Sequence, residues 1–220
     1  MVYRLAVLAA GAASSAAQAR RLVAAIAARP SGTLPAAISE VLGALSGSGA
    51  GDVSAGACVD SRGMLISIAL PEGSVLEPLL VLAKDHGLAV YDIALNRLYD
   101  PDDCVEIEVL LPGLRLPFVT RELLVDLVAH PQWPQPSAPY VILARSGEDF
   151  IQTWLTDNGV YQLEYREGGA EFHFVHHTRD PAEVTEVMWA WALEGVRWRG
   201  AVGWEFLDIS RCAVSAVPAT

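Results

Sequence analysis

The sequence predicts an α+β protein made of two small domains. Its 220 residues are 52% hydrophobic and 19% charged, which is typical of globular proteins and unlike disordered ones. A chain of this length fits two units of roughly 100 residues better than one small or two large domains. Short β-prone runs joined by turn residues occur in both halves, and helical patterns separate them, so antiparallel sheets with packed helices are expected.

Residues 1–103 are expected to form a ferredoxin-like domain. In order, the pattern predicts a strand at 2–8, a helix capped by Ser14 or Ser15 that ends near 28, a shorter helix at 34–45, strands at 53–59 and 64–70, a helix at 74–86 that ends at Gly87, and a strand at 88–93. Apart from the extra helix this is the βαββαβ order of the split βαβ unit. We therefore expect one antiparallel sheet with the helices at 15–28 and 74–86 on one face.

Residues 104–220 are expected to form a second domain, an antiparallel meander packed by an N-terminal and a C-terminal helix. The pattern predicts a strand at 105–111, a helix capped by Thr120, an irregular proline-rich stretch at 131–139, strands at 140–144, 150–155, 160–165 and 171–177, a helix capped by Thr178 or Asp180, and a last strand at 204–209. Turn residues at 157–159 and 168–169 link the middle strands.

The charge of the chain restricts its partners. The formal net charge is −11, and such a protein repels nucleic-acid phosphates at long range. Residues 1–103 carry 10 acidic and 7 basic side chains, whereas residues 104–220 carry 16 and 8. The acidic field therefore belongs mainly to the second half, where a basic partner would be attracted and a nucleic acid would not.

Cysteine usage and hydropathy favour a cytoplasmic location. Cys58, Cys104 and Cys212 are odd in number and widely spaced, so neither a disulfide framework nor a zinc knuckle is expected. Residues 1–19 resemble a secretory signal, but their apolar part is mostly Ala and Gly behind a single arginine, so we expect no cleaved leader. No apolar run reaches the length of a membrane span, so no membrane partner is expected.

Three histidines near the end of the meander are the densest group of potential metal ligands. A two-residue turn at 168–169 would pair Glu164 with His173 and Tyr161 with His176. Because strand side chains have a period of two, His173 and His177 would share one face and His176 would lie on the other. A solvated strand with cross-strand ion pairs is therefore expected, with no metal and no cofactor.

The same pairing separates a core face from a polar face. The core face would hold Tyr161, Leu163, Tyr165, Phe172 and Phe174, and the polar face Glu164, Arg166, Glu171 and His173. The polar face is either a binding surface or ordinary solvated sheet.

Four of the six tryptophans lie between residues 189 and 204. Trp191 falls in the apolar stripe of the last helix, whereas Trp189 is about 160° away around it. Trp198 lies between Arg197 and Arg199. Tryptophans beside charge are favoured interface anchors, and the alternative is that they pack between the two domains.

A resemblance is carried by several short segments. These are the residues FIQT at 150–153, YQLEYREGG at 161–169, FHF at 172–174, WE at 204–205 and GLAVYD at 87–92. They resemble small bacterial α+β domains of the type III secretion chaperone-like and polymorphic-toxin immunity-like kind, found in actinobacterial genomes. The resemblance implies that the chain binds another protein and catalyses nothing.

The expected function is therefore a non-enzymatic, protein-binding module that neutralises a toxin or chaperones a partner. The residues expected to contact this partner are Glu164, Glu171, Trp189 and Trp198, and no catalytic residue is assigned. The alternative is an enzyme or small-ligand-binding protein that uses a cleft between the two domains.

Overall fold

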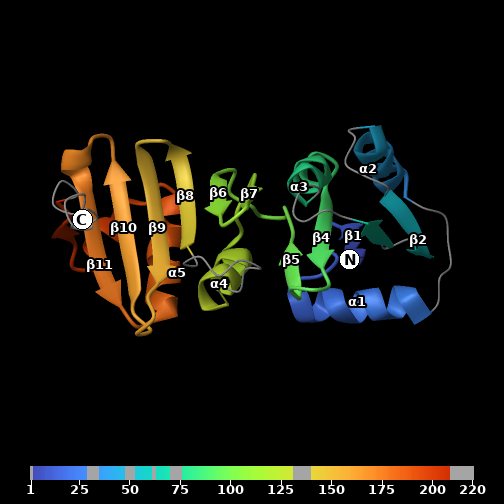
Figure 1. Ribbon diagram of the computed structural model, residues 1–220, viewed down its shortest axis with the longest axis horizontal. Helices are drawn as coiled ribbons and strands as arrows, with labels where there is room; N and C mark the ends of the chain where they lie inside the picture. Colours follow the sequence, from blue (N-terminus) through green and yellow to red (C-terminus); the bar gives the residue numbers. More distant parts are fainter. Residues whose placement is uncertain are drawn as a thin grey trace, which may run out of the picture. The chain divides into compact units, whose positions relative to one another are not determined.

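The computed structural model describes residues 2–28, 35–47, 53–60, 63–69, 76–130 and 140–208 (Figure 1). It has an α+β fold with two antiparallel sheets. Residues 1–106 and 113–123 form one compact unit, and residues 107–112 and 124–220 form the other. The predicted connections at 61–62 and 131–139 lie outside the described residues, as does the predicted strand end at 209.

The first unit is built around a five-stranded sheet with the order β2-β3-β1-β4-β5. Its strands are β1 (Val2–Ala9), β2 (Val53–Asp60), β3 (Gly63–Ala69), β4 (Leu88–Asp92) and β5 (Arg97–Tyr99), and its helices are α1 (Ala16–Ala28), α2 (Ala36–Gly47) and α3 (Leu76–Asp85). The central strand β1 is antiparallel to both β3 and β4. The expectation that the strands at 2–8 and 88–93 belong to one sheet is confirmed.

Helices lie on both sides of this sheet, which differs from the sequence prediction. The side chains of Ala6, Leu8, Ala89 and Tyr91 share one face, where they form a core with Ala19, Val23 and Ile26 of α1. The other face is equally buried at Leu5, Val7 and Val90, and α2 and α3 lie across the strands from α1 (Figure 1). The expectation that α1 and α3 share one face is therefore wrong. Uninterrupted apolar strands such as Leu5–Leu8 need cover on both faces.

The second sheet has the order β12-β11-β10-β9-β8-β6-β7. Its strands are β6 (Glu108–Leu111), β7 (Leu114–Leu116), β8 (Tyr140–Ser146), β9 (Asp149–Leu155), β10 (Tyr161–Glu167), β11 (His173–Thr178) and β12 (Glu205–Phe206). The helical segments in this half are α4 (Arg121–Ala129), α5 (Pro181–Ala192) and two 3₁₀ turns, η1 (Ala170–Phe172) and η2 (Val196–Gly200). The meander and its final helix agree with the prediction, whereas the last strand is only two residues long.

The predicted caps explain where the helices of this half begin. The hydroxyl of Thr120 accepts the backbone N–H of Leu123 at the start of α4. The carboxylate of Asp180 accepts the N–H of Ala182, and Pro181 takes the first position of α5, where its missing N–H costs nothing. From α5, Val184, Val187, Met188 and Trp191 are buried, as the apolar stripe predicts.

Candidate functional site

The register of β10 and β11 corrects the predicted pairing by two residues. Arg166 lies opposite His173, and Glu164 lies opposite Val175. The turn is longer than the two glycines suggest, because η1 is inserted between Gly168 and His173. Gly168 has φ +79°, a conformation that favours glycine, and Phe172 donates its N–H to the carbonyl of Gly169.

A shift of two residues leaves every strand side chain on its predicted face. His173 and His177 still share one face, and His176 lies on the other, where its Nδ1 is 3.0 Å from the carbonyl of Gly203. Two residues assigned to these faces lie in η1 instead and are exposed: Phe172, expected in the core, and Glu171, expected on the polar face. The sequence carried no signal for the extra 3₁₀ turn.

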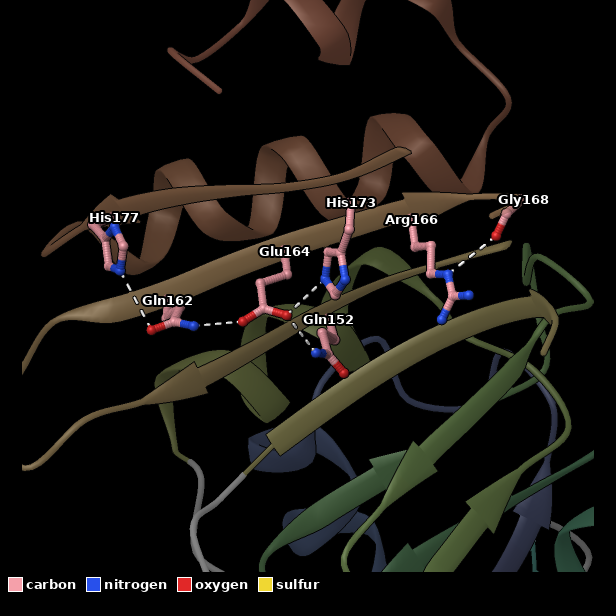
Figure 2. Close-up of polar contacts among 7 residues, drawn as sticks. All are labelled: Gln152, Gln162, Glu164, Arg166, Gly168, His173 and His177. Atoms are coloured by element: carbon pink, nitrogen blue, oxygen red, sulfur yellow. Dashed lines mark hydrogen bonds and ion pairs between the residues drawn. The ribbon is translucent and has the colours of Figure 1, made fainter. Parts of the chain in front are cut away.

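One face of the second sheet combines polar and aromatic side chains in three cross-strand rows. The rows are Tyr140, Trp154, Gln162 and His177; Ile142, Gln152, Glu164 and Val175; and Ala144, Phe150, Arg166 and His173. We call these twelve side chains the polar–aromatic face. Figure 2 shows Gln152, Gln162, Glu164, Arg166, His173 and His177 projecting away from α5, and strand alternation places the other six side chains on the same face.

The carboxylate of Glu164 is the centre of a hydrogen-bond network on this face (Figure 2). Its Oε2 accepts the side-chain amide of Gln152 at 2.8 Å and lies 2.9 Å from Nε2 of His173. Its Oε1 accepts the side-chain amide of Gln162, whose own carbonyl lies 3.3 Å from Nε2 of His177. The Glu164 and His173 side chains are only 7% and 8% exposed.

One imidazole nitrogen of His173 contacts this carboxylate, and the other does not. The side-chain amides of Gln152 and Gln162 both donate to Glu164, and Nε2 is the His173 nitrogen that lies against it. Its Nδ1 is buried and has no hydrogen-bond partner among the described residues. The contact with the carboxylate of Glu164 fixes the orientation of the imidazole ring, so Nδ1 faces away from this carboxylate.

Arg166 closes the end of the same face without joining the network. Its Nε donates to the carbonyl of Gly168 at 3.0 Å, and its guanidinium forms an ion pair with Glu148. The ring of Phe150 stands edge-to-face against His173, with centroids 5.9 Å apart. The network therefore has a charged border and an aromatic neighbour.

The sequence predicts only part of this site. Its patterns indicate Glu164, Arg166 and His173 on the polar face, but Gln152, Gln162 and Trp154 were not among the predicted site residues. The turn at Asp157-Asn158-Gly159 was a usable signal, because it pairs Gln152 with Glu164 when the strands alternate.

The tryptophans expected to contact a partner have different environments. Trp198 is 4% exposed, and its ring packs against Tyr165 and Trp204 with centroid separations of 4.7 and 6.0 Å. Trp189 is half-buried on α5. Trp198 thus belongs to the interior of the second unit.

An aromatic cluster continues from Trp198 toward the edge of the sheet. Tyr165 stacks on Phe174 at 5.0 Å, and Phe174 meets the exposed Phe206 at 6.0 Å. Burial raises the pKa of the Tyr165 hydroxyl, and the carboxylate of Glu167 raises it further. This tyrosine stays neutral at physiological pH and serves as a packing residue.

No group of three or more His, Cys, Asp or Glu side chains within the described ranges is placed to hold a metal ion. No described helix has the length and apolar character required to cross a bilayer. Comparison with known proteins gave no matching family model, no matching curated protein and no matching solved structure.

Proposed function

We propose that the chain is a non-enzymatic, protein-binding module and that the polar–aromatic face is its contact surface. The observation that carries this proposal is the exposure of Trp154. This residue is 39% exposed and lies between the half-buried Tyr140 and the hydrogen-bond network of Glu164. Aromatic side chains are enriched at interface centres, because each of them buries a large area when a partner binds.

The charge around this face favours a basic partner. Glu108 lies opposite Ala144 and Glu205 opposite Val175, and both carboxylates are exposed, while the charge of Arg166 is balanced by Glu148. An acidic rim accelerates association with a basic protein and repels nucleic acid. Toxin neutralisation or chaperoning remains the most specific version of this proposal.

The four residues expected to contact a partner then divide into two kinds. Glu171 is exposed, and Trp189 is half-buried, so both remain proposed contact residues. Glu164 and Trp198 are buried, so we propose that they stabilise the unit that carries the contact surface.

The division into domains at 103/104 and a ferredoxin-like first domain also remain proposals. The strand order β2-β3-β1-β4 supports the ferredoxin-like assignment.

The test begins with capture of a partner at low salt and continues with purified components. Trp154→Ala should weaken the affinity at least about tenfold and leave the melting temperature unchanged. Leu193→Ala is the matched control, because this side chain is 56% exposed at the end of α5, away from the face. The association rate should also fall as salt rises.

A Trp154→Ala variant with wild-type affinity, together with a salt-independent association rate, would refute this surface. Trp189→Ala in the same assay shows whether the contact extends to α5. If Trp189 only packs within the unit, its loss will lower the melting temperature and leave the affinity of the folded protein unchanged.

A further inference from the structure

The exposed indole of Trp154 carries an inference about what the partner offers. This residue is 39% exposed, and it lies directly opposite Tyr140 of β8 and Gln162 of β10. An exposed indole can be covered by an aliphatic group, by another ring or by a cation over its face. The side chains around Trp154 decide among these three.

A glutamine on the same strand provides a hydrogen-bond acceptor beside this ring. Gln152 lies two residues before Trp154 on the same face, about 7 Å away along β9. Its amide nitrogen donates to Glu164 at 2.8 Å, so the planar amide directs its carbonyl oxygen away from that carboxylate (Figure 2). Gln152 is half-buried, and none of the described residues donates a hydrogen bond to this oxygen. The hydrogen-bond network therefore presents an acceptor next to an exposed aromatic ring.

The charge of the polar–aromatic face favours a cation. Glu108 and Glu205 are exposed on this face, and the chain carries a formal net charge of −11. Arg166, the arginine among the twelve side chains, already forms an ion pair with Glu148. A positively charged group of the partner is therefore attracted to this face, and an anionic group is repelled.

The guanidinium of arginine fits this combination better than the other groups do. An aliphatic group or a neutral ring on Trp154 would cover the carbonyl oxygen of Gln152 without giving it a donor, which costs free energy. The ammonium of lysine carries the charge, but it is compact and strongly hydrated. A guanidinium is planar and more weakly hydrated, so it can stack on the indole while N–H groups at its edge donate to the oxygen.

We propose that the partner places an arginine side chain on this face, with its guanidinium stacked on the indole of Trp154 and one N–H donating to the side-chain carbonyl of Gln152. This inference rests on the protein-binding function proposed above and adds the chemistry of the contact.

The first experiment needs no partner and uses the N-acetyl amides of arginine, citrulline and lysine as probes. Citrulline has the shape of arginine without its charge, and lysine has the charge without the planar group. At equal concentration and ionic strength, the arginine probe should shift the indole N–H resonance of Trp154 at least about threefold more than citrulline and about twofold more than lysine. Trp154→Leu identifies this resonance by its loss. An equal or larger shift with either other probe overturns the inference, as does the absence of a shift with all three.

Two glutamine variants test the acceptor. Gln152→Met removes the carbonyl oxygen with little change in side-chain volume. Gln162→Met is the matched control, because it also removes one donor from Glu164, but its own carbonyl lies against His177. In folded proteins, the advantage of arginine over lysine should disappear in Gln152→Met and persist in Gln162→Met. An advantage that survives in Gln152→Met, or that is lost equally in both variants, overturns the inference.

A purified partner separates this inference from the proposed function. Trp154→Phe keeps an aromatic face, whereas Trp154→Leu keeps only apolar surface, so Trp154→Leu should bind at least about threefold more weakly than Trp154→Phe. If these two variants bind alike while Trp154→Ala binds weakly, the contact surface stands and the arginine inference is overturned. If Trp154→Ala also binds like the wild type, the surface and the inference are both overturned.

Discussion

The central strands of the two sheets carry different side-chain patterns. In β1 and β4, Leu5–Leu8 and Leu88–Asp92 are buried at every position, and helices lie on both sides. In β9 and β10 the fully buried positions Ile151, Thr153 and Leu163 alternate with polar or aromatic residues that face away from α5. A sheet covered on both sides offers no surface, whereas a sheet covered on one side can expose side chains of its other face, as this sheet does at Trp154.

The largest effect is expected in the aromatic cluster that supports the second sheet. Trp198→Ala should lower the free energy of unfolding by about 3–5 kcal/mol, because a buried indole leaves a large cavity. Phe206→Ala is the control: this ring belongs to the same cluster but is 58% exposed, and its loss should cost under about 1 kcal/mol.

Urea unfolding followed by tryptophan fluorescence measures this difference. All six tryptophans lie at residue 133 or later, so the signal reports the second unit alone. Equal losses in the two variants would contradict the assignment of Trp198 to the interior.

A second pair of substitutions compares the two sheets directly. Leu5→Ala should cost about 2–5 kcal/mol, because β1 is enclosed on both sides. Ile142→Ala removes a half-buried side chain from the polar–aromatic face and should cost under about 1 kcal/mol. Far-ultraviolet circular dichroism follows both units, which matters because the first unit contains no tryptophan. If Ile142→Ala proves as costly as Leu5→Ala, this face is a core and not a surface.

A third comparison uses two glutamates of the second unit, Glu164 in β10 and Glu171 in η1. Glu164→Ala leaves the donors of Gln152, Gln162 and His173 without their acceptor, and a loss of about 1–3 kcal/mol is expected. Glu171→Ala removes an exposed carboxylate and should change stability by less than about 0.5 kcal/mol. Thermal unfolding of both variants at one pH is the measurement. Equal stability of the two variants would show that the network is solvated.

The smallest effect is expected from the ion pair between Arg199 and Glu167, both of which reach solvent. Arg199→Ala should cost no more than about 1 kcal/mol, and the difference from the wild type should shrink as salt screens the pair. Unfolding midpoints at low and high salt measure it. A salt-independent loss would indicate that the stem of Arg199 stabilises by packing on Trp198, over which its guanidinium lies at 5.2 Å from the ring centroid.

Local sequence patterns are sufficient to predict many of the helices and strands of this protein, because a cap or an alternating pattern acts over a few residues. The caps at Thr120 and Asp180, the stripe that buries Trp191 and the alternation that separates His176 from His173 all follow from residues a few positions apart. The α+β class follows from the same patterns.

The features that depend on packing between distant segments could not be predicted from these local patterns. The 3₁₀ turn η1 precedes His173 and shifts the pairing of β10 and β11 by two residues. Helices lie on both sides of β1, and Trp198 is enclosed against Tyr165. The side chains of Gln152, Gln162 and His173 meet at the carboxylate of Glu164. Periodicity fixes the face on which a side chain lies, but burial and hydrogen bonding depend on which other strands and helices cover that face.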